Sequence, residues 1–124
     1  MAARAQKTPR KREVAKDIAW MGSSKEDLIE FPEEIRRLAG QQLRKVQFGE
    51  DADDADCMSR VGAGCYELRF RDKAGWYRVI YVAKFEKAVY VLHSFSKKTN
   101  ATPQTDIDLA IVRYGEAKRH AGVK

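Results

Sequence analysis

Most of the residues in this 124-residue chain that could do chemistry lie in one stretch, residues 66–99. The stretch carries many basic side chains, few acidic ones and a single histidine. Arginine and lysine neutralise phosphates, tyrosine stacks on bases, and histidine titrates near neutral pH. Such a set can bind a polyanion and stabilise a charged phosphorane without a metal. The candidate residues are Arg69, Arg71, Lys73, Arg78, His93, Lys97 and Lys98.

Other kinds of site lack residues that they need. Residues 62–64 (GAG) are too short a glycine motif for a phosphate-binding loop, and no serine or cysteine nucleophile motif is recognisable. The acidic residues 50–56 lack the glycine turn and the final glutamate of a calcium loop. Cys57 and Cys65 fit no zinc spacing; they could form one disulfide, but we expect free thiols. We therefore predict no metal and no cofactor.

The elements that must position these residues are short strands. In residues 66–71, apolar side chains alternate with Glu67, Arg69 and Arg71, so a strand sends the two sets to opposite faces. Two further segments rich in β-branched and aromatic residues follow, up to residue 95. The connections between the three segments have hairpin length. We predict a three-stranded antiparallel meander with an apolar face and an arginine-bearing face.

A further strand and two helices are predicted before the meander. Residues 14–21 have strand composition and are expected to join the sheet. Apolar residues at helical spacing predict two helices within residues 23–48, and Pro32 marks the start of the second. Residues 50–64 are expected to form an acidic loop.

A third helix is predicted over residues 103–118. Thr102 is the expected N-cap before Pro103, and Ile107 and Ile111 belong to the apolar stripe. The predicted fold class is α+β: an antiparallel sheet, made of the N-terminal strand and the meander, with all three helices packed on one face.

The charge of the chain, +6 in total, is unevenly distributed. Residues 1–13 are basic and without periodicity, so we expect a disordered tail, whereas residues 14–120 form one domain. The acidic residues 50–56 are possible partners for Arg69 and Arg71. No apolar run approaches the roughly 20 residues of a membrane span, and no secretory signal is recognisable. We expect a cytoplasmic protein with a polyanionic partner.

Five segments in this order resemble the RelE/ParE toxin superfamily of type II toxin–antitoxin modules, and most closely its phage-derived HigB-like branch. The resemblance extends over about residues 14–118. The segments are WMGSSKEDL at residues 20–28, FPEE at 31–34, GCYELR at 64–69, YRVIY at 77–81 and HSFSKKT at 93–99.

The resemblance implies a RelE-like fold and the activity of an mRNA interferase. Such toxins cut mRNA in the ribosomal A site with the RNA's own 2′-hydroxyl as nucleophile, without metal, and leave a 2′,3′-cyclic phosphate. Glu67 stands where RelE has a lysine, and Gln104 or a neighbour replaces its tyrosine. The candidate for proton transfer is therefore His93 or a lysine with a lowered pKa. The implied catalytic residues are Arg69, Arg78, His93 and Lys98, and the implied RNA-binding residues are Arg71, Lys73 and Lys97.

The resemblance also implies a cognate antitoxin, which we expect to be a small helix-turn-helix protein from the adjacent reading frame, beside mRNA and the ribosome as partners. Two other functions remain open. A ParE-like toxin would inhibit DNA gyrase by protein binding alone. A basic nucleic-acid-binding module would lack a complete acid–base set.

Overall fold

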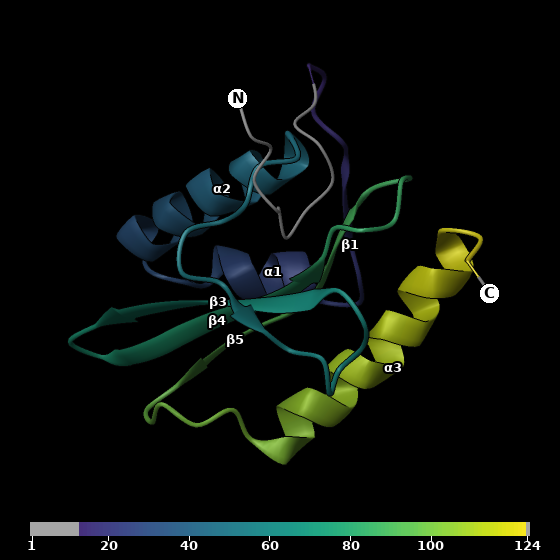
Figure 1. The fold of residues 1–124 in the computed structure, drawn as a ribbon. Coiled ribbons are helices and arrows are strands. Elements are labelled where there is room, and N and C mark those ends of the chain that lie inside the picture. Colours follow the sequence, from purple (N-terminus) through teal and green to yellow (C-terminus); the bar gives the residue numbers. More distant parts are fainter. Residues whose placement is uncertain (1–12, 124) are drawn as a thin grey trace, which may run out of the picture.

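The computed structural model describes residues 13–123, so the predicted basic tail lies outside the described residues except for Glu13. The chain has the predicted α+β class (Figure 1). Its elements, in order, are β1 (Ile18–Trp20), α1 (Ser24–Ile29), α2 (Glu33–Gln47), β2 (Asp56–Cys57), β3 (Cys65–Asp72), β4 (Gly75–Val82), β5 (Val89–Lys97) and α3 (Gln104–His120).

Strands β3, β4 and β5 form the predicted antiparallel meander at the centre of a five-stranded sheet, whose order is β1-β5-β4-β3-β2. The β3–β4 hairpin turns between Asp72 and Gly75, and this short turn places Arg69 opposite Arg78. Gly75 adopts φ 150°, and a Cβ there would lie 2.7 Å from the Lys97 carbonyl oxygen. The turn therefore fixes the register of every side chain on both strands.

Two details of the predicted sheet are wrong. Strand β1 joins the sheet as expected, but it pairs with β5 in the parallel direction, so the sheet is mixed. The helical connection through α1 and α2 separates β1 from the meander, and no hairpin forces β1 to run antiparallel. The acidic loop also contains the short strand β2, which pairs with β3 and extends the sheet at the other edge.

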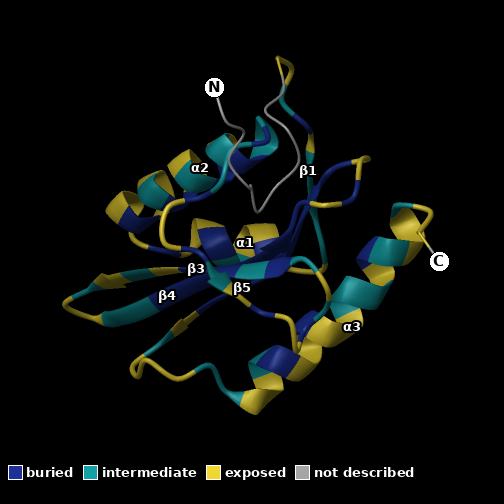
Figure 2. Cartoon of the chain, viewed as in Figure 1, coloured by how far each residue is buried: buried dark blue, intermediate teal, exposed yellow. Residues whose placement is uncertain are grey.

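The helices cover two faces of the sheet, which corrects the expected packing on one face. Helices α1 and α2 pack on the face that carries Leu68, Val79 and Tyr81, whereas α3 packs on the face that carries Ile80 and Leu92 (Figures 1 and 2). Residues 79–82 are apolar without alternation, and all four are buried. A strand that is covered on both faces has this pattern.

Helix α3 contacts the sheet through a narrow stripe. Ile107, Ala110 and Ala117 are buried, and Tyr114 packs against the same core. Ile111 is 42% exposed, so its predicted place in the stripe is wrong. The stripe follows the spacing i, i+3, i+7 and i+10 from Ile107, which puts Ile111 at its margin.

The two cysteines are free thiols, as expected: Cys57 is exposed and Cys65 is buried in the core under α3. Burial raises the pKa of the Cys65 thiol to about 12. Among residues 13–123, no helix has the length and apolar character that crossing a membrane requires.

Candidate functional site

Five of the predicted site residues, Arg69, Arg71, Arg78, His93 and Lys97, share the sheet face that is partly covered by α3; Lys73 lies in the β3–β4 turn and Lys98 follows β5. Residues opposite one another in neighbouring strands point to the same face. Three cross-strand rows result from the observed register: Asp56, Glu67, Ile80 and His93; Arg69, Arg78 and Phe95; Arg71, Trp76 and Lys97. The alternation that was predicted for β3 thus brings all of its basic residues to this face.

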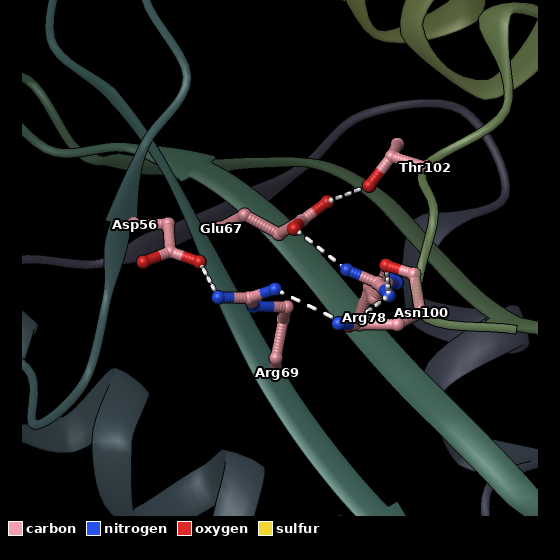
Figure 3. A network of polar contacts seen from close by, with 6 residues as sticks. All are labelled: Asp56, Glu67, Arg69, Arg78, Asn100 and Thr102. Carbon is pink, nitrogen blue, oxygen red and sulfur yellow. Dashed lines mark hydrogen bonds and ion pairs between the residues drawn. The ribbon is translucent and has the colours of Figure 1, made fainter.

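A buried ion pair lies at the centre of this face (Figure 3). Arg78 Nη1 is 2.9 Å from Glu67 Oε1, and the two side chains are only 1% and 3% exposed. Thr102 Oγ1 donates to the other Glu67 oxygen at 3.0 Å, and Arg78 Nη2 donates to both Asn100 Oδ1, at 3.1 Å, and the Asn100 carbonyl oxygen. The pair therefore links the sheet to the segment before α3.

The positions of Arg78 and Thr102 differ from what their roles predicted from the sequence require. In the described conformation the Arg78 guanidinium is covered, so it cannot contact a phosphate directly. Thr102 is not the N-cap of α3, because Pro103 occupies that position and no side chain caps the helix. The Thr102 hydroxyl instead satisfies Glu67, whose buried carboxylate needs hydrogen-bond donors.

Arg69 lies beside the buried pair and closer to solvent. It forms an ion pair with Asp56, and its Nη1 donates to Asn100 Oδ1 at 3.3 Å (Figure 3). The sequence left open whether Arg69 and Arg71 pair with the acidic segment; Arg69 does so, whereas Arg71 lies over the Trp76 ring. The side chain of Arg69 is 34% exposed, so it keeps a surface that a ligand can reach.

The histidine belongs to a second group, between β5 and α3. His93 Nε2 lies 2.7 Å from Asp106 Oδ1, and Lys97 Nζ lies 3.4 Å from the other oxygen of Asp106. The imidazole also stacks on the Phe95 ring, with the two ring centroids 4.6 Å apart. Burial lowers the pKa of His93 even though the Asp106 carboxylate opposes this shift, so the neutral imidazole predominates at neutral pH. Within the described chain, His93 Nδ1 has no hydrogen-bond partner.

Exposed cations gather at the end of the sheet, around the β3–β4 turn and the end of β5. Arg71, Lys73 and Lys98 are exposed, and Lys97 is half-buried. The Trp76 ring lies among them, with the Arg71 guanidinium carbon 5.2 Å from its centroid. A cavity of about 260 Å³ is lined by Trp76, Lys97 and Lys98, together with residues 74, 75, 77 and 96.

The predicted site residues thus lie in three clusters: Arg78 with Arg69, His93 beside Asp106, and the exposed cations near Trp76. His93 is on β5 and Arg69 is on β3, two strand spacings or about 10 Å away across the sheet. Lys97 connects the second and third clusters, since it contacts Asp106 and lies in the row of Arg71 and Trp76. The contacts of Asp106, Asn100 and Thr102 were not predicted from the sequence.

No group of three or more His, Cys, Asp or Glu side chains within residues 13–123 is arranged to hold a metal ion. The basic residues offer other chemistry: they can bind phosphates, and His93 with Asp106 can carry a proton.

Comparison with known proteins places the chain in a family. The model of the phage derived protein Gp49-like family (DUF891) matches residues 26–115, well over half of the chain. No curated protein matches significantly.

Among solved structures, an arginine-to-alanine double mutant of Escherichia coli toxin RelE in the free state aligns with a TM-score of 0.53 at 18% identity, over 86% of this chain and 98% of that chain. The toxin–antitoxin complex RelBE2 of Mycobacterium tuberculosis gives a TM-score of 0.48 at 17% identity, over 72% of this chain and 99% of that chain. This chain therefore belongs to the phage-derived Gp49-like family, and its fold is that of the RelE toxin, as the predicted membership of the RelE/ParE superfamily requires.

Proposed function

We propose that this protein is the toxin of a type II toxin–antitoxin module and a metal-independent endoribonuclease that cleaves ribosome-bound mRNA. The observation that carries the proposal is the gathering of Arg71, Lys97 and Lys98 near Trp76, next to the β3–β4 turn that contains Lys73. The sheet face that carries Arg71, Trp76 and Lys97 also carries His93, which is paired with Asp106 of α3. The RelE fold supports it.

The exposed cations suit an RNA backbone. Each neutralised phosphate releases counterions, so these side chains supply affinity that falls as salt rises. Trp76 offers a ring on which a base can stack, a contact that is common where single-stranded RNA binds. We assign Arg71 and Lys73 to phosphates that flank the cleaved bond, and Arg69 to the nucleotide beside them.

The reaction centre in this proposal is the end of β5 rather than Arg69. Lys97 is joined to His93 through Asp106, so a phosphate held by Lys97 lies near the proposed base. In this proposal Lys97 and its neighbour Lys98 hold the scissile phosphate. In the described conformation His93 Nε2 faces Asp106 and Nδ1 is buried. In this scheme RNA binding opens the end of β5 over Nδ1, which then takes the proton of the 2′-hydroxyl. The 2′-oxygen attacks phosphorus while the bond to the 5′-oxygen breaks. A lysine ammonium returns a proton to the leaving 5′-oxygen, and the second product carries a 2′,3′-cyclic phosphate.

Arg78 acts in this scheme as a positioning residue. Its guanidinium holds both the carbonyl and the side-chain oxygen of Asn100, which is two residues after Lys98. The buried pair with Glu67 keeps Arg78 in place. The segment that carries Lys98 is thereby fixed against the sheet. We expect Arg78→Ala to abolish activity, because it frees this segment and also leaves the Glu67 carboxylate buried without its partner.

The test is the mapping of RNA 5′ ends after induction of the toxin, with DNA supercoiling followed in the same cells. We expect cleaved mRNA, 2′,3′-cyclic phosphate ends, no inhibition by EDTA of the purified reaction, and a loss of about 10²–10³ in rate for Lys98→Ala. Lys25→Ala, an exposed lysine on α1 on the other face of the sheet, serves as the control. Intact mRNA with lost supercoiling would instead favour a gyrase-inhibiting toxin of the ParE kind.

A toxin of this kind needs a neutralising partner. We propose a cognate antitoxin, a small helix-turn-helix protein from the adjacent frame, with an acidic segment that covers the cations. The net charge of +6 supports an acidic partner, whose charge would speed association. Co-expression should restore growth and yield a complex in cytoplasmic extracts, whereas harmless expression of this chain alone would contradict the toxin proposal.

A further inference from the structure

A second cavity, of about 290 Å³, lies on the same face of the sheet, toward the edge strand β2. It is lined by Asp54, Asp56, Arg69, Trp76 and Asn100. Its size is near the lower end of the roughly 300–1,000 Å³ that small-molecule sites span. One nucleobase with part of its sugar suits such a volume.

The chemistry of this cavity differs from that of the cationic end of the sheet. Two carboxylates, Asp54 and Asp56, stand in its wall beside Arg69. A carboxylate repels the phosphates of an RNA strand, but it accepts hydrogen bonds from the amino groups of bases. The cavity is therefore suited to a base edge rather than to the backbone.

The backbone places Asp54 with some strain. Strand β2 pairs Asp56 with Glu67, and two further residues of extended strand would have put Asp54 opposite Arg69. Asp54 instead has φ 54°, a left-handed conformation that non-glycine residues rarely adopt, and it lies in the turn that precedes β2. Its neighbour Asp53 is turned away and bonds to Lys45 and Gln42 of α2. Strained residues of this kind cluster at ligand sites.

We propose that this cavity binds a guanine base of the RNA; the inference rests on the proposed function. The Watson–Crick edge of guanine carries two adjacent donors, N1–H and N2–H, which suit the two oxygens of the Asp54 carboxylate. Its O6 and N7 atoms accept from an arginine, the commonest specific contact to guanine. Arg69 gives one nitrogen to Asp56 and another to Asn100, and its five N–H groups leave donors for the base.

The other bases match this pattern less well. Adenine and cytosine each place an acceptor nitrogen beside their amino group, and this acceptor would face a carboxylate oxygen. Uracil has one N–H between two carbonyl groups. Trp76, which also lines the cavity, adds a ring that any base can contact, so it contributes affinity without choosing the base.

The test measures binding without cleavage. The full chain is titrated, at one fixed low salt concentration, with fluorescent 2′-O-methyl oligouridines that contain a single guanine, inosine or adenine. These probes lack the nucleophilic hydroxyl, so they are not cleaved by 2′-hydroxyl attack. We expect the inosine and adenine probes to bind about tenfold more weakly than the guanine probe. Inosine lacks the N2 amino group, and adenine has an acceptor nitrogen where guanine has N1–H. In Asp54→Asn the affinities for the guanine and inosine probes should become nearly equal.

Asp53→Asn is the matched control, since it changes the net charge equally in the neighbouring residue that faces α2. It should keep the guanine preference. Equal affinity of the wild type for all three probes, no binding of any probe, or an unchanged ratio in Asp54→Asn would overturn the guanine site. Cleavage is measured separately on ordinary RNA; guanine preference without any cleavage would refute the ribonuclease proposal and leave the base pocket standing.

Discussion

Replacing Glu67 by glutamine keeps the size of the side chain but removes the charge that compensates the buried Arg78 guanidinium. Both groups are almost fully covered, at 3% and 1% exposure. Breaking one half of a buried ion pair costs about 3–5 kcal/mol, because the remaining charge stays in a poorly solvated place. We therefore expect Glu67→Gln to lower the free energy of unfolding by about 3 kcal/mol, which corresponds to roughly 10 °C in Tm for a domain of this size.

The control comes from the same face of the sheet. Asp56→Asn breaks another ion pair between an arginine and an acidic residue, but the side chains of Arg69 and Asp56 are 34% and 47% exposed. Exposed pairs contribute about 0–1 kcal/mol. Urea unfolding at pH 7, followed by tryptophan fluorescence, measures both variants. If Glu67→Gln unfolds at the same urea concentration as Asp56→Asn, the burial argument for the Glu67–Arg78 pair is refuted.

Three further predictions concern other parts of the chain. Burial lowers the pKa of His93 below its ordinary value of about 6.5, so the free energy of unfolding should be highest above that pH and decrease as the pH drops below it. Urea unfolding of His93→Gln should show a smaller decrease with falling pH. The same pH dependence in His93→Gln and the wild type would contradict this. Gly40→Ala should raise Tm and stabilise the protein by up to about 1 kcal/mol, since a Cβ there meets nothing within 4 Å inside α2; a lowered Tm would count against it. Iodoacetamide should label exposed Cys57 in minutes and leave Cys65 unmodified in the folded protein by mass spectrometry, whereas equal labelling would show that the core under α3 opens readily.

The sequence was informative where local rules decide the structure. The alternation in β3 and the short hairpin at residues 72–75 set which side chains share a face, and both were predicted. The same register implies that Glu67 and Arg78 are diagonal neighbours on one face, a relation that can be worked out from the turn alone. The absence of alternation in residues 79–82 likewise indicates a strand buried on both faces, so the position of α3 on the second face had a signal in the sequence.

Other features depend on packing between distant segments. The direction of β1 beside β5 is set by how α1 and α2 return the chain to the sheet, which no short pattern encodes. Asn100 and Thr102 come from an irregular segment, and their contacts with Arg78 and Glu67 arise only when that segment lies on the sheet. No pattern in the sequence indicated the contact of Asp106, because its distance from His93 depends on the docking of α3.

The buried pair explains how one surface can be both strongly basic and well ordered. If Arg78 were exposed like Arg69, it would add one more positive charge to the basic face and leave the segment around Asn100 without an anchor. Paired with Glu67, it contributes no net charge, and its remaining N–H groups hold Asn100, which also accepts from Arg69. Asn100 thus joins the buried pair to the exposed arginine, between the proposed reaction centre at Lys97 and Lys98 and the cavity lined by Asp54. A variant that loosens Asn100, such as Asn100→Gly, should therefore weaken cleavage and guanine preference together, whereas Asp54→Asn should affect the base preference first.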